Sequence, residues 1–201
     1  FDALMDFNIA FSEFVRDAVG QTVRCTCPGG TELTFELDAM KLVRPRSATE
    51  PGIYTVPGTQ SLYPKAGSVR GRIVIQALFD EFYRALRRPI TIEADGRITG
   101  LVGGAAEDRA SFHRALVRAG GEGGGYGGFV HFTCGFHPAT MMTGREFIED
   151  IRVPGTNAIG MGLPWWEPGG GENHPDGIVF DQSLWIGDVP LMRDGVFIGP
   201  G

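Results

Sequence analysis

The order of apolar and polar residues along this chain predicts many short strands and few helices. The segments with helical spacing are residues 3–19, 105–119 and 144–151. The segments typical of strands are residues 22–27, 32–37, 70–78, 90–93, 97–102, 129–134, 157–161, 177–186 and 189–198. Short turns join six of these into three hairpins, the last formed by 177–186 and 189–198. In the second helix we expect Phe112, Leu116 and Val117 on the buried side.

Other segments lack such a pattern. Residues 44–68 are rich in Pro, Gly and Ser and are expected to hold little regular structure. The basic stretch Arg84 to Arg88 is predicted to end a helix, where cations are favoured. A glycine run at 120–128 is no phosphate-binding loop, because no Gly-Lys-Ser/Thr follows it. The predicted fold class is α+β: a strand-rich mixed or antiparallel sheet with a few helices, forming one unit over residues 1–201.

Composition narrows the classes of partner. The formal net charge is −6 and the pI is about 5.2, which argues against nucleic acid. No run of about 18 apolar residues occurs, so we expect no membrane span. Three cysteines without a disulfide framework indicate a reducing cytoplasm. The chain starts FDALMDF, without Met or a signal pattern, and we expect it to be the C-terminal part of a longer protein.

The chain has four histidines, a residue type with frequent catalytic and metal-binding roles. His113 lies among charged residues of a predicted helix and is interpreted as a surface residue. His137 precedes a proline in a turn and suits a loop or supporting position better than that of a ligand. His131 lies on a predicted strand, in the segment FVHFTC. His174 opens the triplet His-Pro-Asp, before the strand that starts at 177.

The triplet at 174–176 is the strongest candidate for chemistry. Residues i and i+2 of an extended segment share a face, so His174 and Asp176 can converge on one point. Two histidines and one carboxylate on one face of a metal ion leave positions open for substrate and oxygen. The loop at 163–173, which carries Trp165 and Trp166, lies beside the triplet in sequence. These residues predict a site for one metal ion at His131, His174 and Asp176.

Five stretches resemble, in the same order and with similar spacing, motifs of the aminopeptidase T family of thermophilic metallopeptidases. They are most similar to its 2,5-dihydroxypyridine 5,6-dioxygenase branch. The stretches are PGIYTVPGTQSLYPKAGSVRGRIVI, ITIEADGRITGL, FVHFTCGFHP, RVPGTNAIGMG and HPDGIVFDQSLWIGDVPLMRDGVFI. The resemblance covers most of the chain and implies the fold of that family's catalytic domain.

Departures from the peptidase pattern indicate which branch fits. Where the peptidases have metal-binding Glu, Glu and His, this chain has Gln60, His131 and Ala158. Glutamine is a poor bridging ligand and alanine binds no metal, so a second metal would lose its ligands. The ligands that remain are His131, His174 and Asp176. They match the mononuclear triad of the ring-cleaving dioxygenases in this lineage. The resemblance therefore implies non-haem Fe(II) as cofactor.

The resemblance also implies a reaction: cleavage of a hydroxylated aromatic or N-heteroaromatic ring by O2, with protein groups moving protons. The candidates for that proton transfer are His137, Tyr54 and Gln60. Trp165 and Trp166 are candidates for stacking on the flat substrate, or else they pack the loop onto the core. The relatives imply a homo-oligomer, whose partners are a small aromatic substrate and O2.

Two other interpretations stay open at this stage. A metal-dependent aminopeptidase with Zn or Co on the same scaffold predicts two metals and peptide hydrolysis. A non-catalytic module on this scaffold predicts neither metal binding nor O2 consumption.

Overall fold

The structure is a computed structural model that describes residues 2–41, 57–121, 125–170 and 173–199. Within these residues three helices and twelve strands occur, with 19% of the described residues helical and 43% in strands. Every strand pairing in the described part is antiparallel. The α+β class predicted from the sequence is confirmed, and the sheet is antiparallel.

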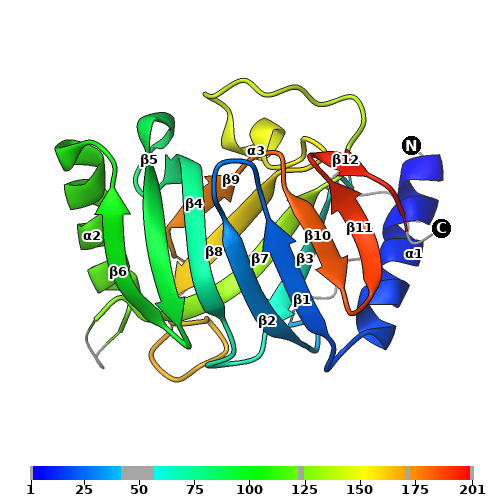
Figure 1. The fold of residues 1–201 in the computed structure, drawn as a ribbon, viewed down its shortest axis with the longest axis horizontal. Coiled ribbons are helices and arrows are strands. Elements are labelled where there is room, and N and C mark those ends of the chain that lie inside the picture. Colours follow the sequence, from blue (N-terminus) through cyan, green and yellow to red (C-terminus); the bar gives the residue numbers. More distant parts are fainter. Residues whose placement is uncertain (1, 42–56, 122–124, 171–172, 200–201) are drawn as a thin grey trace, which may run out of the picture.

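The elements are labelled in Figure 1. The helices are α1 (Asp2–Asp17), α2 (Ala106–Ala119) and α3 (Phe147–Asp150). The strands of the first half are β1 (Thr22–Thr26), β2 (Glu32–Asp38), β3 (Thr59–Pro64), β4 (Arg70–Phe79), β5 (Tyr83–Asp95) and β6 (Ile98–Gly103). Those of the second half are β7 (Gly128–Gly135), β8 (Asn157–Gly162), β9 (Asp176–Val179), β10 (Ser183–Ile186), β11 (Val189–Arg193) and β12 (Val196–Phe197).

Six of the strands close into a ring. The sheet has the order β12-β11-β10-β1-β2-β3-β7-β8-β9-β4-β5-β6, and β2 also pairs with β4. The path from β2 through β3, β7, β8, β9 and β4 therefore returns to β2. Figure 1 accordingly shows β1, β2 and β4 in front of β7, β8 and β9. Side chains of these strands alternate between the inside of the ring and its outer face.

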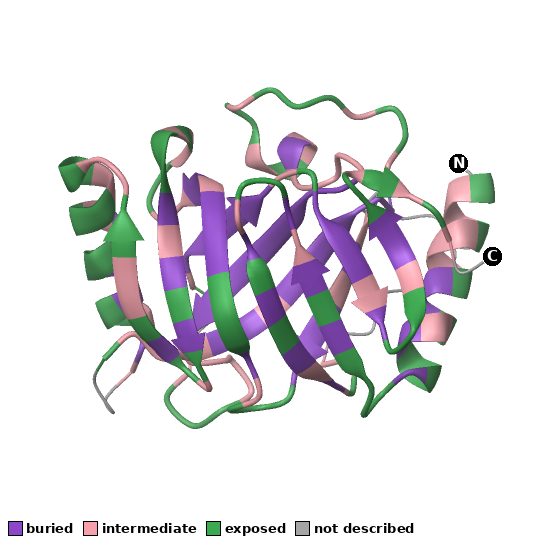
Figure 2. Cartoon of the chain, viewed as in Figure 1, coloured by how far each residue is buried: buried purple, intermediate pink, exposed green. Residues whose placement is uncertain are grey.

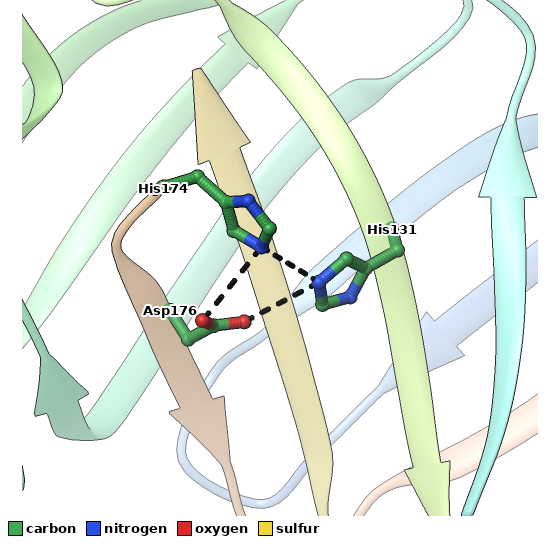
Figure 3. A group of neighbouring side chains, drawn as sticks. All are labelled: His131, His174 and Asp176. Carbon is green, nitrogen blue, oxygen red and sulfur yellow. Dashed lines mark hydrogen bonds and ion pairs between the residues drawn. The ribbon is translucent and has the colours of Figure 1, made fainter. Parts of the chain in front are cut away.

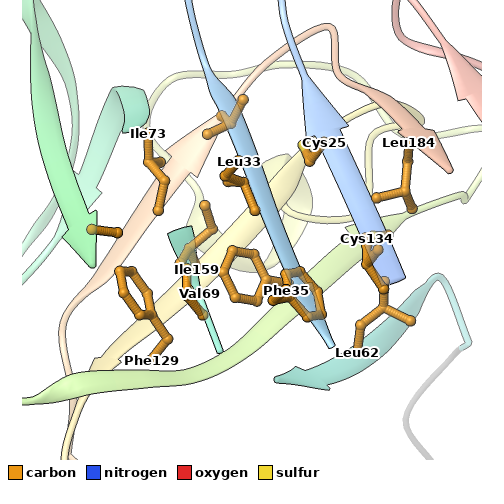
Figure 4. Packing of buried hydrophobic residues seen from close by; sticks show 14 of the residues in the cluster. Cys25, Leu33, Phe35, Leu62, Val69, Ile73, Phe129, Cys134, Ile159 and Leu184 are labelled. Atoms are coloured by element: carbon orange, nitrogen blue, oxygen red, sulfur yellow. The ribbon is translucent and has the colours of Figure 1, made fainter. Parts of the chain in front are cut away.

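The hydrophobic core fills the inside of the ring (Figure 4). Phe35 of β2 stacks on Phe132 of β7 with ring centroids 4.4 Å apart, which joins the front and back strands. Cys25, Cys27 and Cys134 are buried and form no disulfide. Figure 2 shows the front strands alternating between buried and exposed residues, whereas β8 and β9 are buried throughout. Both faces of β8 and β9 are therefore covered, the inner by the core and the outer by other parts of the chain.

Two sequence predictions are corrected in the first half of the chain. The segment 44–68 contains a regular strand, β3, while residues 42–56 lie outside the described part. The basic stretch Arg84 to Arg88 belongs to β5 and ends no helix. Arginine has good helix propensity, but β5 pairs with β4 at Tyr83–Ala85 and again at Ile90–Asp95, and such tertiary pairing overrides propensity. Arg84 there forms ion pairs with Asp80 and Asp108.

Two further corrections concern the second half. The segment 177–186 is two strands, because the chain turns at Asp181, whose φ is +51°. β9 then pairs with β8 and β4, whereas β10 pairs with β1 and β11. The rest of the predicted closing hairpin, 189–198, is likewise two strands, β11 and β12, which pair with each other across a turn at Asp194, whose φ is +47°. Phe112 and Leu116 of α2 are buried as predicted, but Val117 is exposed. Among the described helices, none combines the length and the apolar character needed to cross a membrane.

Candidate metal centre

Three adjacent strands bring His131 and Asp176 to the same outer face. In the strand register, His131 of β7 lies opposite Gly160 of β8, and Gly160 lies opposite Asp176 of β9. Register partners point to the same side of a sheet. β7 and β9 are two strand spacings apart, which is roughly 10 Å in total. A glycine in the middle of this row leaves open the space into which the flanking side chains converge.

The three predicted ligands meet over Gly160 (Figure 3). His131 Nε2 lies 2.9 Å from His174 Nε2 and 3.6 Å from Asp176 Oδ1. His174 Nε2 lies 3.8 Å from Asp176 Oδ2. Their ligand atoms all lie within 4.8 Å of one another, and no other such group of three or more occurs in the described residues. This arrangement can hold one ion with positions left open.

A β-bulge in β7 turns His131 toward the outer face. The register with β8 shifts between Phe129 and His131, so Val130 is an extra residue. Phe129 packs in the core with Phe132, three residues later, which strict alternation would forbid. Beyond the bulge alternation holds, with Phe132 inward and His131 outward. Because of the bulge, β7 can place Phe129 and Phe132 in the core and His131 on the outer face.

His174 reaches the site from the segment just before β9. It stands two residues before Asp176, which gives both side chains the same face, as the sequence predicts. The carbonyl of Pro175 accepts a hydrogen bond of 3.0 Å from the amide of Met161 on β8. This bond continues the β8–β9 pairing past the end of β9 and holds the His-Pro-Asp segment against the sheet.

The charge of Asp176 is poorly compensated by the protein. Its side chain is 8% exposed, and its Oδ1 atom accepts no hydrogen bond from a described residue. Burial raises the pKa of Asp176 to about 7. A buried carboxylate oxygen without a donor is costly unless a cation balances it. Two imidazoles and such a carboxylate around an open space fit a divalent transition metal ion.

An open groove of about 1210 Å³ includes the three ligands. Tyr63 and Trp165 line it on one side, and Phe79 and Phe147 line it on another. The Trp165 ring lies nearly parallel to the His174 ring at 21°, with centroids 6.3 Å apart. Aromatic walls and a few convergent polar groups are typical of sites for small flat ligands.

The two predicted tryptophans take different places. Trp165 lines the groove beside His174. Trp166 stands edge-on to Trp165, with centroids 4.5 Å apart, and it also contacts Tyr63. Trp166 is not among the residues that line the groove, and it lies under the Lys41 ammonium, 5.7 Å from its ring centre. Trp165 therefore lines the groove, where a ligand could contact it, and Trp166 packs against Trp165.

The two described proton-transfer candidates, Gln60 and His137, are not brought to the groove. Gln60 points to the inner side of β3, where its Oε1 accepts a hydrogen bond from Ser12 of α1. His137 lies beyond the end of β7, and its Nδ1 accepts from the amide of Ala139. Neither lines the groove. Tyr54 lies outside the described residues.

Sequence reasoning missed three residues on the outer face. Gly160 forms the floor beneath the two imidazoles. Thr133 Oγ1 lies 2.9 Å from His131 Nδ1, and Ser61 Oγ lies 2.8 Å from Thr133 Oγ1. Thr133 stands two residues after His131, so the alternation that marked His131 could also have marked Thr133. Ser61 and Gly160 become neighbours only through the pairing of β3 and β8 with β7.

Removing the charge of Asp176 is expected to stabilise the metal-free protein. The pKa of Asp176 is about 7 in the folded chain against an ordinary value of 3.8, so the ionised form opposes folding. Its stabilising neutral form is fully present below about pH 4 and is lost as pH rises through about 7. Metal-free Asp176→Asn should therefore melt at least about 3 °C above wild type at pH 8, since 1 kcal/mol is worth roughly 2–4 °C at this size.

Thermal melting between pH 4 and pH 8 in a chelator measures this difference. It should shrink toward pH 4, where both chains carry a neutral group at 176. Asp188→Asn is the matched control at an exposed position and should show no such trend. A lower melting temperature for Asp176→Asn at pH 8 would contradict the stated electrostatics.

Known proteins resemble this chain in fold. No family model and no curated protein matches its sequence. The solved structure of 2,5-dihydroxypyridine dioxygenase from Pseudomonas putida superimposes with a TM-score of 0.69 at 17% identity, over 94% of this chain. Wild-type AmpT, an aminopeptidase T, from Thermus thermophilus superimposes with a TM-score of 0.66 at 16% identity, over 99% of this chain.

The chain has the fold of these two enzymes. It spans 60% of the length of the dioxygenase chain and 56% of that of AmpT. The fold implied by the sequence motifs is thus confirmed. The names of the two neighbours describe different chemistry, and at 16–17% identity the similarity shows the fold alone and selects no reaction. That selection depends on the residues of the groove.

Proposed function

We propose that this chain forms the catalytic part of a mononuclear non-haem Fe(II) dioxygenase. Its substrate would be a hydroxylated aromatic or N-heteroaromatic compound such as 2,5-dihydroxypyridine. The observation that carries the proposal is the convergence of His131, His174 and Asp176 over Gly160. Two histidines and one carboxylate with open positions are the ligand set of non-haem Fe(II) oxygenases. Bound Fe(II) would supply O2 activation and would coordinate a hydroxyl of the substrate.

The residues around the triad favour one ion over two. The row next to His131, Gly160 and Asp176 on the outer face contains Ser61, Thr133, Ala158 and Ile178. None of these is a carboxylate or an imidazole. Asp80, another acid of the groove, is held by Arg84 and Ser111. Burial alone would raise the pKa of Asp80, but these hydrogen bonds lower it well below its usual range. Asp80 is therefore already balanced by protein groups.

The groove fits a flat ring. Trp165 and Tyr63 present aromatic surface near His174, and Phe79 and Phe147 stand with centroids 4.5 Å apart on another wall. These residues would orient the ring and exclude water from it. Ser61 is one of the hydroxyl-bearing residues that line the groove, and its hydroxyl could donate to a substrate oxygen. Proton transfer is assigned to no residue, because Gln60 and His137 lie elsewhere.

The deciding experiment uses the full-length protein purified without oxygen. Metal content is measured first, and O2 uptake is then recorded with 2,5-dihydroxypyridine and with simple phenols. About one iron per chain, together with O2 uptake on a hydroxylated ring, is the expected result. Two zinc or cobalt ions with release of amino acids from peptides would instead establish the aminopeptidase. Absence of both activities and of metal would indicate a non-catalytic module.

Assembly belongs to the same proposal. The partners are a small aromatic substrate and O2, and the protein would act as a homo-oligomer in the cytoplasm. Light scattering coupled to size-exclusion chromatography measures the number of chains. A monomer that retains full activity would remove oligomerisation from the proposal and leave the chemistry intact.

A further inference from the structure

Two hydroxyl groups connect a metal ligand to the wall of the groove. His131 Nδ1 lies 2.9 Å from Thr133 Oγ1, which lies 2.8 Å from Ser61 Oγ. Thr133 is 6% exposed, and it pairs in register with Ser61 on β3 and with Ala158 on β8. Ser61 and Thr133 both line the groove. The chain of contacts therefore starts on a ring nitrogen of His131 and ends at a groove hydroxyl.

The direction of these hydrogen bonds depends on the tautomer of His131. If Nδ1 carries the proton, it donates to Thr133 Oγ1, and the threonine hydroxyl then donates to Ser61. If Nε2 carries the proton, the threonine hydroxyl donates to Nδ1. Only the first arrangement leaves the lone pair of Nε2 facing His174 and Asp176, where a metal ion would bind.

We propose that Thr133, backed by Ser61, is a positioning residue that holds His131 as the Nδ1–H tautomer for metal binding. The inference rests on metal binding at this site and is independent of the reaction that follows. In the metal-free protein the short contact between the two Nε2 atoms requires a proton, which this tautomer places on His174. Metal binding at Nε2 of His174 would require this proton to move to Nδ1 of the same ring, while His131 is already in its binding form.

The hydroxyl of Thr133 can be removed with little change of shape. Thr133→Val leaves a buried Nδ1–H without an acceptor, so His131 should shift to the Nε2–H tautomer. Loss of such a supporting partner typically weakens metal binding about 10- to 100-fold. We expect a weakening in this range for Co²⁺ and Zn²⁺, measured by competition with a chromophoric chelator. Thr133→Ser should restore affinity, and Ser61→Ala should fall between wild type and Thr133→Val.

Histidine nitrogen NMR reads the tautomer directly, and four histidines keep the spectrum simple. With ¹⁵N-histidine and Zn²⁺ or no metal, wild type should show a protonated Nδ1 at His131. Metal-free Thr133→Val should show a protonated Nε2. A change of tautomer together with the affinity loss supports the inference, because a merely structural role would leave the tautomer unchanged.

Thr156→Val is the matched control. Thr156 is also buried, 2% exposed, but its hydroxyl donates to the carbonyls of Ile151 and Val153 instead of contacting a ligand. It should keep wild-type metal affinity even if its melting temperature falls. Unchanged affinity and tautomer in Thr133→Val would overturn the inference while leaving the metal centre intact. Absence of metal binding by the wild-type protein would overturn both.

Discussion

Replacing His131 with alanine is expected to abolish stoichiometric metal binding while the protein remains folded. His131 is one of the three proposed ligands, and its Nε2 lies within 3.6 Å of the ring nitrogen of His174 and of the carboxylate of Asp176. Removing a ligand should cost more than the about 10- to 100-fold that follows from loss of a supporting partner. Iron bound after anaerobic reconstitution and desalting should therefore fall below detection, and O2 uptake should be lost with it.

His113→Ala is the matched control for this prediction. His113 is exposed on α2 and its ring contacts Tyr126, away from the three ligands. It should keep the metal content and activity of the wild type. Circular dichroism and thermal melting establish that both variants fold. Retention of metal and activity by folded His131→Ala would show that the ligand assignment is wrong.

The three candidate ligands can be selected from the sequence because part of their geometry is local. His174 and Asp176 share a face through their spacing of two, and His131 lies in a strand with clear alternation. The position of Gln60 was not accessible in the same way. Its strand lies in a segment rich in Pro and Gly, and a phase error of one residue exchanges the two faces. The structure turns Ser61 toward the groove and Gln60 toward α1.

The fold was predictable to a similar degree. Most strands were recognisable from alternation, and the motif order indicated the scaffold. The division of 177–186 into β9 and β10 was missed, because it depends on a turn at Asp181 and on strand partners far apart in sequence. The arginines of 84–88 have helix propensity, yet pairing of β5 with β4 on both sides of residues 86–89 keeps this stretch in a strand. In both cases long-range pairing outweighed the local pattern.

A methyl group at position 160 is expected to eliminate the metal site without removing a ligand. An added Cβ on Gly160 would lie 2.5 Å from His131 Nε2 and 2.7 Å from His174 Nε2. Both imidazoles would have to move away from the point on which they converge. The metal affinity of Gly160→Ala should therefore be less than about a hundredth of that of wild type. This loss is larger than the one expected when a supporting contact is removed. Titration with Co²⁺ and its visible absorption spectrum measure this loss.

Gly128→Ala is the matched control, because it lies on the adjacent strand β7 and an added Cβ there meets nothing within 4 Å. It should bind metal as wild type does. Overpacking should also lower the stability of metal-free Gly160→Ala by about 1–3 kcal/mol. Part of this loss should disappear in the His131→Ala background, where one colliding ring is absent, so a double-mutant cycle should show coupling. If Gly160→Ala binds Co²⁺ with wild-type affinity, the ion does not lie where the three side chains converge. Coupling in the cycle combined with lost binding locates the ion directly above this glycine, because only a shared position makes the methyl group, the imidazole and the metal compete.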